Sequence, residues 1–264
     1  MKPKLTKPID NFISWQENLT QMFAQSRAMY VQSFPDMIYG HNGLDFISAG
    51  LRNGYGSKIL AAHDFQSVVI DTDFPTKQRG NGIYLRGLLP VPFMVNGTMA
   101  YYIESCYWHL SDFEVTPDIK NGKSGDIIGL MGNAGFVIPR PTPKEPWNGT
   151  HLHFGIRFYD VHGNIIHSQF SGDYVDPLPF LFSTGEKIGT QAFLRSDMTL
   201  GSYGDQVSKL QSLLSLSGDF NDEPTGQYGP KTFSAVQSFQ KKCGIVPLGI
   251  CGPKTRMFIN NLYN

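Results

Sequence analysis

Short apolar and aromatic runs, each bounded by Gly, Pro, Asn or Asp, recur between residue 41 and about residue 182. Segments of this length between turn-forming residues are typical of strands in an antiparallel sheet. The pattern therefore predicts a mostly antiparallel β domain in this part of the chain. The clearest predicted strands are Ser67–Ile70, Ile83–Leu85, Met99–Ile103 and His153–Phe158.

Residues 9–30 fit two different structures. Their apolar residues have a spacing that places them on one face of a helix, but Leu19–Phe23 fits an entering strand equally well. The apolar positions are Phe12, Trp15, Leu19, Met22, Phe23 and Tyr30.

The pattern becomes helical from residue 195 onward, and part of it is repeated. Gly226–Thr232 is echoed by Gly249–Thr255, and each segment places a Pro and then a Thr where a helix begins. Proline is well tolerated there because the first helical N–H has no partner within the helix. We therefore expect three short helices over 195–264. Their apolar faces are Val207, Leu210, Leu213 and Leu214; Phe233, Val236 and Phe239; and Phe258, Ile259 and Leu262.

These two patterns predict an α+β, multidomain fold. A length of 264 residues suits one large or two ordinary domains. We expect a mostly antiparallel β domain over residues 1–185, a linker over 186–194, and a small three-helix domain over 195–264.

Charge and hydropathy exclude some classes of function. The chain has 22 Lys and Arg and 22 Asp and Glu, so its formal net charge is zero and a large basic surface for nucleic acid is not indicated. The N-terminal region lacks the apolar segment of a secretory signal, and nothing approaches the ~20 apolar residues of a membrane helix. We expect neither nucleic-acid binding nor membrane insertion.

Three cysteines are present: Cys106, Cys243 and Cys251. An odd number in a chain of this length does not indicate a disulfide framework, and no CxxC pair suggests a metal site. Three mostly buried thiols made in a reducing compartment are the favoured interpretation, and a Cys243–Cys251 bridge is the alternative.

Two short strings carry candidate chemistry: His41-Asn42-Gly43-Leu44-Asp45 and His151-Leu152-His153. On a strand, residues i and i+2 share a face, so His151 and His153 project into one cleft. Two imidazoles and a carboxylate suit zinc and leave a fourth position for water, whose pKa the metal lowers. His109, in Trp108-His109-Leu110, supplies one more imidazole. The set predicts a hydrolytic zinc site.

Two neighbouring features leave alternatives open. His63, followed by Asp64 and an apolar strand, is the one plausible rival ligand. The Pro-rich segment 139–149 cannot be regular helix or central strand. It is either a surface excursion or a wall of the substrate cleft that offers Trp147 as a contact.

The ordered motifs resemble those of the M23 zinc metallopeptidases, the lysostaphin- and LytM-like peptidoglycan endopeptidases. The likeness runs from about Leu19 to Leu181. It departs from the usual family pattern at Phe23-Ala24, at His63–Gln66 and in the longer segment 136–150. The matching segments are Gly40–Phe46, Trp108–Leu110, Gly125–Gly129, Gly132–Gly135, His151–Phe154 and Val175–Leu178.

The resemblance implies a two-layer antiparallel β domain with an open groove and one zinc ion. By matched position, His41, Asp45 and His153 would hold Zn²⁺. His151 would act as general base or orient the water, and His109 would stabilise the oxyanion or share the proton transfer. A tyrosine upstream of the first ligand helps some members, and either Tyr30 or Tyr39 could correspond to it.

Residues 195–264 resemble the type 1 peptidoglycan-binding domain, a three-helix module found on many wall hydrolases. Most of the matching residues belong to the framework of that module. They are Leu200-Gly201, Gly204, Val207, Leu210-Gln211, Leu214, Gly226, Gly229-Pro230, Thr232, Ala235-Val236, Phe239-Gln240 and Gly252–Thr255.

Together the two resemblances imply a monomeric zinc endopeptidase that cuts stem peptides or cross-bridges of bacterial peptidoglycan, its partner. A catalytic domain before a wall-binding domain, without a signal peptide, is the order of phage lysins. Such a protein is made in the cytoplasm and reaches the wall through holin pores or on the virion. The alternatives are a non-catalytic adaptor with this fold and a zinc hydrolase for an amide or acyl group.

Overall fold

The structure is a computed structural model, and it describes residues 2–26, 29–30, 32, 40–49, 51–72, 79–167, 173–183, 186–189 and 193–263. By internal packing the chain separates into two compact units. The first comprises Met1–Thr20 with Asp45–Ile166, and the second comprises Gln21–Leu44 with His167–Asn264. The domain limits expected from the sequence, 1–185, 186–194 and 195–264, stay predictions.

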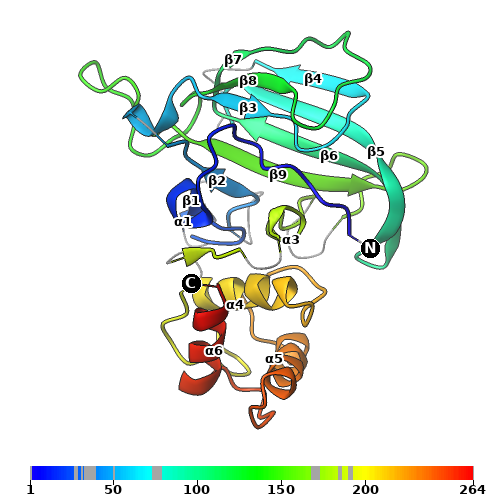
Figure 1. Cartoon of the computed structure of the whole chain (residues 1–264), viewed down its shortest axis with the longest axis vertical. Coiled ribbons are helices and arrows are strands. Elements are labelled where there is room, and N and C mark those ends of the chain that lie inside the picture. Colours follow the sequence, from blue (N-terminus) through cyan, green and yellow to red (C-terminus); the bar gives the residue numbers. More distant parts are fainter. Residues whose placement is uncertain are drawn as a thin grey trace. The chain divides into compact units, whose positions relative to one another are not determined.

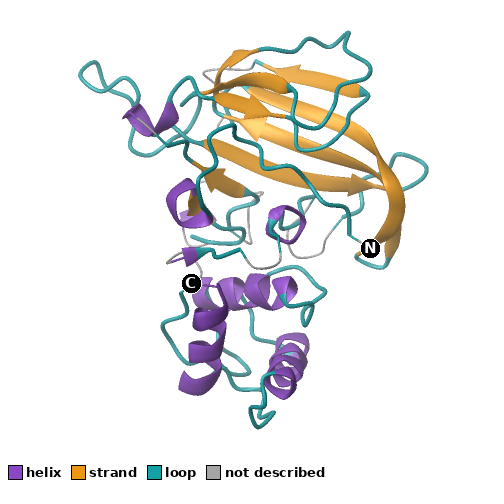
Figure 2. Ribbon diagram, in the orientation of Figure 1, coloured by secondary structure: helices purple, strands orange, loops and turns teal. Residues whose placement is uncertain are grey.

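Two sheets form the β part of the chain (Figures 1 and 2). The larger has the order β1-β2-β9-β6-β5-β4, and the smaller has the order β3-β8-β7. All pairings with a described register are antiparallel, as the sequence predicted. The strands are β1 (Leu19–Gln21), β2 (Leu44–Phe46), β3 (Lys58–Leu60), β4 (Ser67–Asp71), β5 (Gly82–Val95), β6 (Thr98–Trp108), β7 (Leu110–Phe113), β8 (Ile127–Met131) and β9 (Leu152–Tyr159).

The apolar core of the first unit lies between these sheets. Gly129 of β8 passes so close to β5 that a Cβ atom on it would lie 3.5 Å from the Cδ1 atom of Ile83. Tyr107, Phe154 and Ile156, on the same face as Ile83, are completely buried. The opposite face, by alternation, presents Tyr84, Glu104, Trp108, His153 and Arg157.

Two strands are longer than the sequence predicted. The expected strands Ile83–Leu85 and Met99–Ile103 are parts of β5 and β6, which pair over most of their length. The register of that pair shifts between Leu88 and Phe93, the stretch that contains Pro90 and Pro92. Proline is tolerated at such an irregularity because no ladder hydrogen bond is required of it there. The two prolines therefore lie at an irregularity within a strand that continues beyond them.

Both interpretations of residues 9–30 hold in part. The one-turn helix α1 (Trp15–Asn18) begins after Ser14, whose side chain accepts a hydrogen bond from the Glu17 N–H. Strand β1 follows directly at Leu19. In the described residues from Phe12 to Phe23, the helical spacing therefore corresponds to a single helical turn.

The three helices expected over 195–264 are present: α4 (Asp205–Leu216), α5 (Pro230–Lys242) and α6 (Pro253–Tyr263). A further short helix, α3 (Leu178–Leu181), belongs to the same unit. Helices α5 and α6 both begin at the prolines of the repeated segments, as predicted. No helix in the described part of the chain is long and apolar enough to cross a membrane.

The internal repeat extends to side-chain contacts. The Gln211 amide donates to the Thr232 hydroxyl and accepts from the Gly226 N–H. The Gln240 amide does the same with Thr255 and Gly249. In each repeat, a buried glutamine of one helix fixes the glycine turn and the first turn of the next helix.

The cysteines form no disulfide bond. Cys243 and Cys251 are free thiols, and Cys106 and Cys251 are buried. The structure agrees with three free thiols, and the reducing compartment stays a prediction.

Candidate metal centre

Three of the predicted residues come together as a cluster that could hold a metal ion. One ligand atom from each of His41, Asp45 and His153 lies within 4.8 Å of the others, and all three side chains are buried. His153 Nδ1 lies 3.2 Å from Asp45 Oδ1. Two ligands at about 2.0–2.2 Å from one tetrahedral zinc are about 3.3 Å apart. The residues therefore fit zinc both by chemistry and by spacing.

His153 is held by the larger sheet. It lies opposite Trp108 in the β6–β9 pairing, and the two rings stack with centroids 4.3 Å apart and planes within 6°. Asp45, in the middle of β2, accepts a hydrogen bond from the Thr20 hydroxyl at its backbone oxygen. The carboxylate and one imidazole are thus positioned by neighbouring strands of one sheet.

The ring of His41 is oriented by a main-chain carbonyl. Its Nδ1 lies 3.2 Å from the carbonyl oxygen of Met22. A carbonyl oxygen can only accept, so Nδ1 carries the proton and Nε2 is the nitrogen available to a cation. The Tyr30 ring lies 5.5 Å from the His41 ring. Of the two upstream tyrosines proposed from the sequence, Tyr39 lies outside the described residues.

His109 occupies the junction between the two sheets. It connects β6 to β7 with φ of 68°, a left-handed conformation that is uncommon for a residue with a side chain. Its Nδ1 donates to the Ala134 carbonyl at 2.7 Å. Burial, and next the nearby His151 and His153, lower the pKa of His109 well below the ordinary value of 6.5, so the ring is neutral near pH 7.

His151 is fixed in the same way as His109. Its Nδ1 donates to the Gly149 carbonyl at 2.7 Å, and its Nε2 lies 3.8 Å from Asp45 Oδ2. The His109 and His151 ring centroids are 4.6 Å apart. Because a carbonyl holds the proton on Nδ1 in both rings, Nε2 of each is left to accept a proton.

The rival ligand His63 is not part of this cluster. It is buried on the core side of the larger sheet, where its Nδ1 contacts the Asp64 carbonyl and its Nε2 lies 2.9 Å from Ser105 Oγ. Burial lowers its pKa. Its role is that of a hydrogen-bonded core residue.

The Pro-rich segment contributes to the site through its end. The Asn133 amide donates to the Pro146 and Asn148 carbonyls, and Arg52 lies over the Trp147 ring at 4.4 Å. At the end of the segment, the Gly149 carbonyl accepts the hydrogen bond from His151 Nδ1. Its use as a wall of a substrate cleft stays a prediction.

Sequence reasoning missed the groups that orient the two free histidines. Gly132–Gly135 had been noted as a matching segment without a role, yet its Ala134 carbonyl fixes His109. Gly80 makes this approach possible, since a Cβ there would lie 2.2 Å from the Ala134 oxygen. A main-chain carbonyl has no signature in sequence, so no motif could have indicated these contacts.

With this geometry in place, comparison with known proteins assigns the C-terminal helices. Residues 203–259 match the family model described as "Putative peptidoglycan binding domain". The C-terminal helices form a peptidoglycan-binding domain. This part of the sequence resemblance is confirmed, and the match includes α4, α5 and most of α6.

Curated relatives match short parts of the chain. An N-acetylmuramoyl-L-alanine amidase, CwlM of Mycobacterium tuberculosis, is 40% identical over 53 residues, which are 20% of this chain and 13% of the amidase. A spore cortex-lytic enzyme of Bacillus cereus is 29% identical over 82 residues, 31% of this chain and 32% of that enzyme. The chain thus spans less than a third of the length of either protein.

Among solved structures, the chain is similar to the antimicrobial peptidase lysostaphin from Staphylococcus simulans. The two are 21% identical, the alignment covers 70% of this chain and 59% of lysostaphin, and the TM-score is 0.41.

Proposed function

We propose that the chain is a zinc-dependent endopeptidase that hydrolyses peptide bonds in the stems or cross-bridges of bacterial peptidoglycan. One observation carries the proposal: a buried His41–Asp45–His153 cluster lies beside His109 and His151, whose Nε2 atoms can accept protons. The peptidoglycan-binding domain over 203–259 supports peptidoglycan as the partner.

Each residue has a definite task in this proposal. His41, Asp45 and His153 would hold the ion. When bound, zinc would polarise the peptide carbonyl and make water nucleophilic at neutral pH. His109 and His151 accept a proton at Nε2 and return it to the leaving amine, or donate to the developing oxyanion once protonated. The Ala134 and Gly149 carbonyls keep both Nε2 atoms available throughout.

The C-terminal domain would act by raising the local concentration of the enzyme on its polymer. Two modules on one chain that engage the same polymer bind it more tightly than either alone. The phage origin, release through holin pores and monomeric state expected from the sequence remain predictions.

The test is the loss of turbidity of purified peptidoglycan, with and without a chelator, followed by zinc addition and mass analysis of the fragments. We expect lysis that stops with the chelator, returns with zinc and produces new peptide amino termini. Release of intact stems from the glycan would instead identify an amide hydrolase. Wall binding without cleavage by zinc-loaded protein would favour the adaptor and overturn the proposal.

His153→Ala tests the ligand assignment separately. We expect it to lose both bound zinc, measured by atomic emission after dialysis, and activity. His162→Ala, which removes an exposed histidine, is the matched control. Full zinc occupancy in folded His153→Ala protein would remove His153 from the ligand set.

A further inference from the structure

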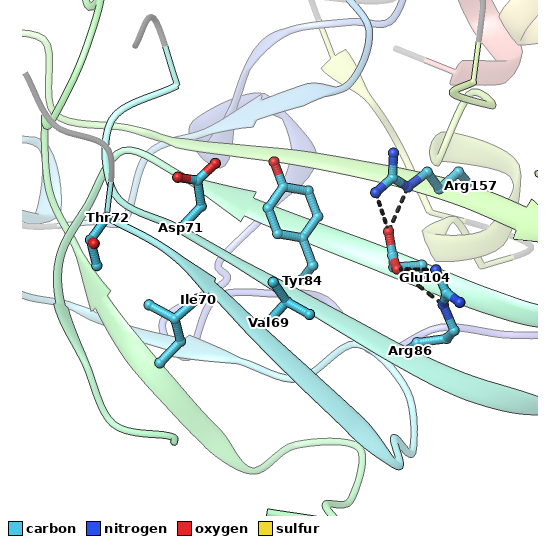
Figure 3. A pocket seen from close by; sticks show the side chains of 8 residues that line it. All are labelled: Val69, Ile70, Asp71, Thr72, Tyr84, Arg86, Glu104 and Arg157. Atoms are coloured by element: carbon cyan, nitrogen blue, oxygen red, sulfur yellow. Dashed lines mark hydrogen bonds and ion pairs between the residues drawn. The ribbon is translucent and has the colours of Figure 1, made fainter. Parts of the chain in front are cut away.

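A second polar constellation lies on the larger sheet, centred on a buried carboxylate. Glu104 of β6 is flanked by Arg86 of β5 and Arg157 of β9, and each guanidinium bonds one carboxylate oxygen (Figure 3). The Glu104 side chain is 6% exposed, whereas those of Arg86 and Arg157 are 40% and 21% exposed. Two cations share one buried anion, so the three groups carry one net positive charge.

These side chains line a pocket of about 530 Å³. Val69 and Asp71 of β4 and Tyr84 of β5 form the rest of its described lining together with Ile70 and Thr72. Asp71 pairs with Gly82, whereas Arg86 pairs with Ser67 four residues away on β4. Four residues of strand are about 13 Å, so the backbone of Asp71 lies about that far along the sheet from the row that contains Arg86.

The pocket shares a face of the sheet with the metal centre. In the β6–β9 pairing, Glu104 lies opposite Arg157 and Trp108 opposite His153, with no shift of register between them. Residues 153 and 157 are separated by an even number of positions and therefore point to the same side. The arginine pair lies about 13 Å along the strand from His153, the length of about four residues of extended peptide.

We propose that Arg86 and Arg157 form a subsite for a carboxylate of the substrate peptide, about four residues from the bond that is cut. The inference rests on the proposed function, since it assumes that the substrate peptide reaches the metal centre. Arginine binds carboxylates through a planar pair of N–H groups, and Glu104 holds both guanidiniums in place at the pocket. The Val69 side chain, which is largely exposed, provides an apolar wall beside them.

Stabilisation of the fold is a poor explanation for a buried cluster of these three charged residues. Removing charges from water is costly, and a buried ion cluster often stabilises a protein less than apolar side chains of similar volume. The exposed parts of the two arginines line an open pocket, so a ligand can reach them. Peptidoglycan stems carry free carboxylates, so the substrate offers the matching chemistry.

The experiment compares two preparations of one ligand. Soluble disaccharide-peptides released from peptidoglycan by a glycan-cleaving enzyme are used as such, or after their carboxylates have been converted to amides. We measure kcat/KM for each and, by calorimetry, binding of each. We expect the wild-type chain to prefer the free carboxylates by about tenfold, the effect of one charge-assisted hydrogen-bond pair.

Arg86→Gln should reduce this preference to less than twofold by lowering kcat/KM for the ligand with free carboxylates. Arg86→Lys should retain part of the preference, because it keeps the charge but loses the paired geometry. If Arg86→Gln fails to fold, the double variant Arg86→Gln, Glu104→Gln removes both charges together. Lys58→Gln, an exposed residue of β3, is the matched control and should retain the full preference.

Each outcome separates the two proposals. Cleavage with no preference, or an unchanged preference in a folded Arg86 variant, overturns the subsite and leaves the endopeptidase. Carboxylate-dependent binding that Arg86→Gln abolishes, in a chain that cleaves neither ligand, supports the subsite and overturns the endopeptidase.

Discussion

Two backbone carbonyls determine how the imidazoles beside the metal cluster are presented. Ala134 and Gly149 each accept the Nδ1 proton of a histidine, at 2.7 Å in both cases. Without them a neutral ring could adopt either tautomer, and its Nε2 would be a base only part of the time. At the residue scale, the proposed chemistry depends on main-chain geometry as much as on side-chain identity.

His109→Ala should therefore leave zinc bound and remove most of the activity. A positioned proton acceptor or donor contributes about 10²–10⁴-fold to the rate, and we expect kcat to fall by that range. The measurement pairs zinc content with kcat on a soluble peptide, and His162→Ala is the control. An active His109→Ala variant would exclude this residue from the mechanism.

Gly80→Ala should disturb the same histidine through the Ala134 carbonyl. Gly80 has φ of 63°, and an added Cβ would lie 2.2 Å from the Ala134 oxygen. Gly97 has φ of 79° with nothing within 4 Å of its added Cβ, so Gly97→Ala measures the conformational cost alone, about 1–2 kcal/mol. We expect Gly80→Ala to lose more stability in denaturant unfolding and to lower kcat. Equal effects of the two variants would contradict the contact.

At the scale of whole elements, burial on the core side of the larger sheet lowers the pKa of His63 and so links its protonation to folding. Its pKa is lowered chiefly by burial, so the unfolded chain binds a proton at a higher pH than the folded chain does. The stability that this group contributes is present above about pH 6.5, the unfolded value, and is lost as the pH falls below it.

We therefore expect the free energy of unfolding to decrease between pH 7.5 and pH 5.5, and to decrease less in His63→Gln. Urea unfolding at several pH values measures the difference in slope, with His162→Gln as the exposed control. A slope unaltered by His63→Gln would show that this residue does not couple protonation to folding.

The repeated glutamines make a prediction about the helices. Gln240 bonds the Gly249 N–H, the Ile250 carbonyl and the Thr255 hydroxyl, and Gln240→Leu leaves these buried groups without that partner. The Thr255 hydroxyl still donates to the Ile250 carbonyl, so the Gly249 N–H is the one of the three left unsatisfied, and we expect a loss of about 1–3 kcal/mol in unfolding free energy. Gln237→Leu removes one bond, to the Pro247 carbonyl, and should cost less. Equal losses would refute the role assigned to Gln240.

At the scale of the whole molecule, the C-terminal helices pack with residues that are distant in sequence. Ser208 of α4 donates to the Ala24 carbonyl, and the Ser212 hydroxyl donates to Asp176. Residues 21–44 belong to the same compact unit as these helices. Ala24 is therefore held by a helix that lies more than 180 positions further along the chain.

Deletion of 195–264 should reduce binding to insoluble peptidoglycan by at least about tenfold, because the polymer is then held by one site instead of two. Co-sedimentation measures the bound fraction. Cleavage of a soluble peptide, normalised to folded protein by circular dichroism, should persist. The loss of the Ser208–Ala24 contact should lower the melting temperature. Undiminished wall binding would refute the anchoring role.

Much of this protein could be predicted from local sequence patterns. Short apolar runs between turn-forming residues placed strands at Ser67–Ile70 and His153–Phe158, and the prolines at 230 and 253 marked helix starts. The ordered motifs selected His41, Asp45 and His153, which the structure brings together. Each of these features depends on a local motif of a few residues, and such motifs can be recognised in the sequence without knowledge of the fold.

Only the tertiary structure shows which residues that are distant in sequence contact one another. Arg86, Glu104 and Arg157 lie on three strands, and only the register of the sheet aligns them. The carbonyls that orient His109 and His151 belong to the backbone, which every residue shares. The sequence by itself determined which side chains are available for chemistry, and the pairing of distant strands determined their partners, because register and chain crossing arise only when the whole sheet assembles.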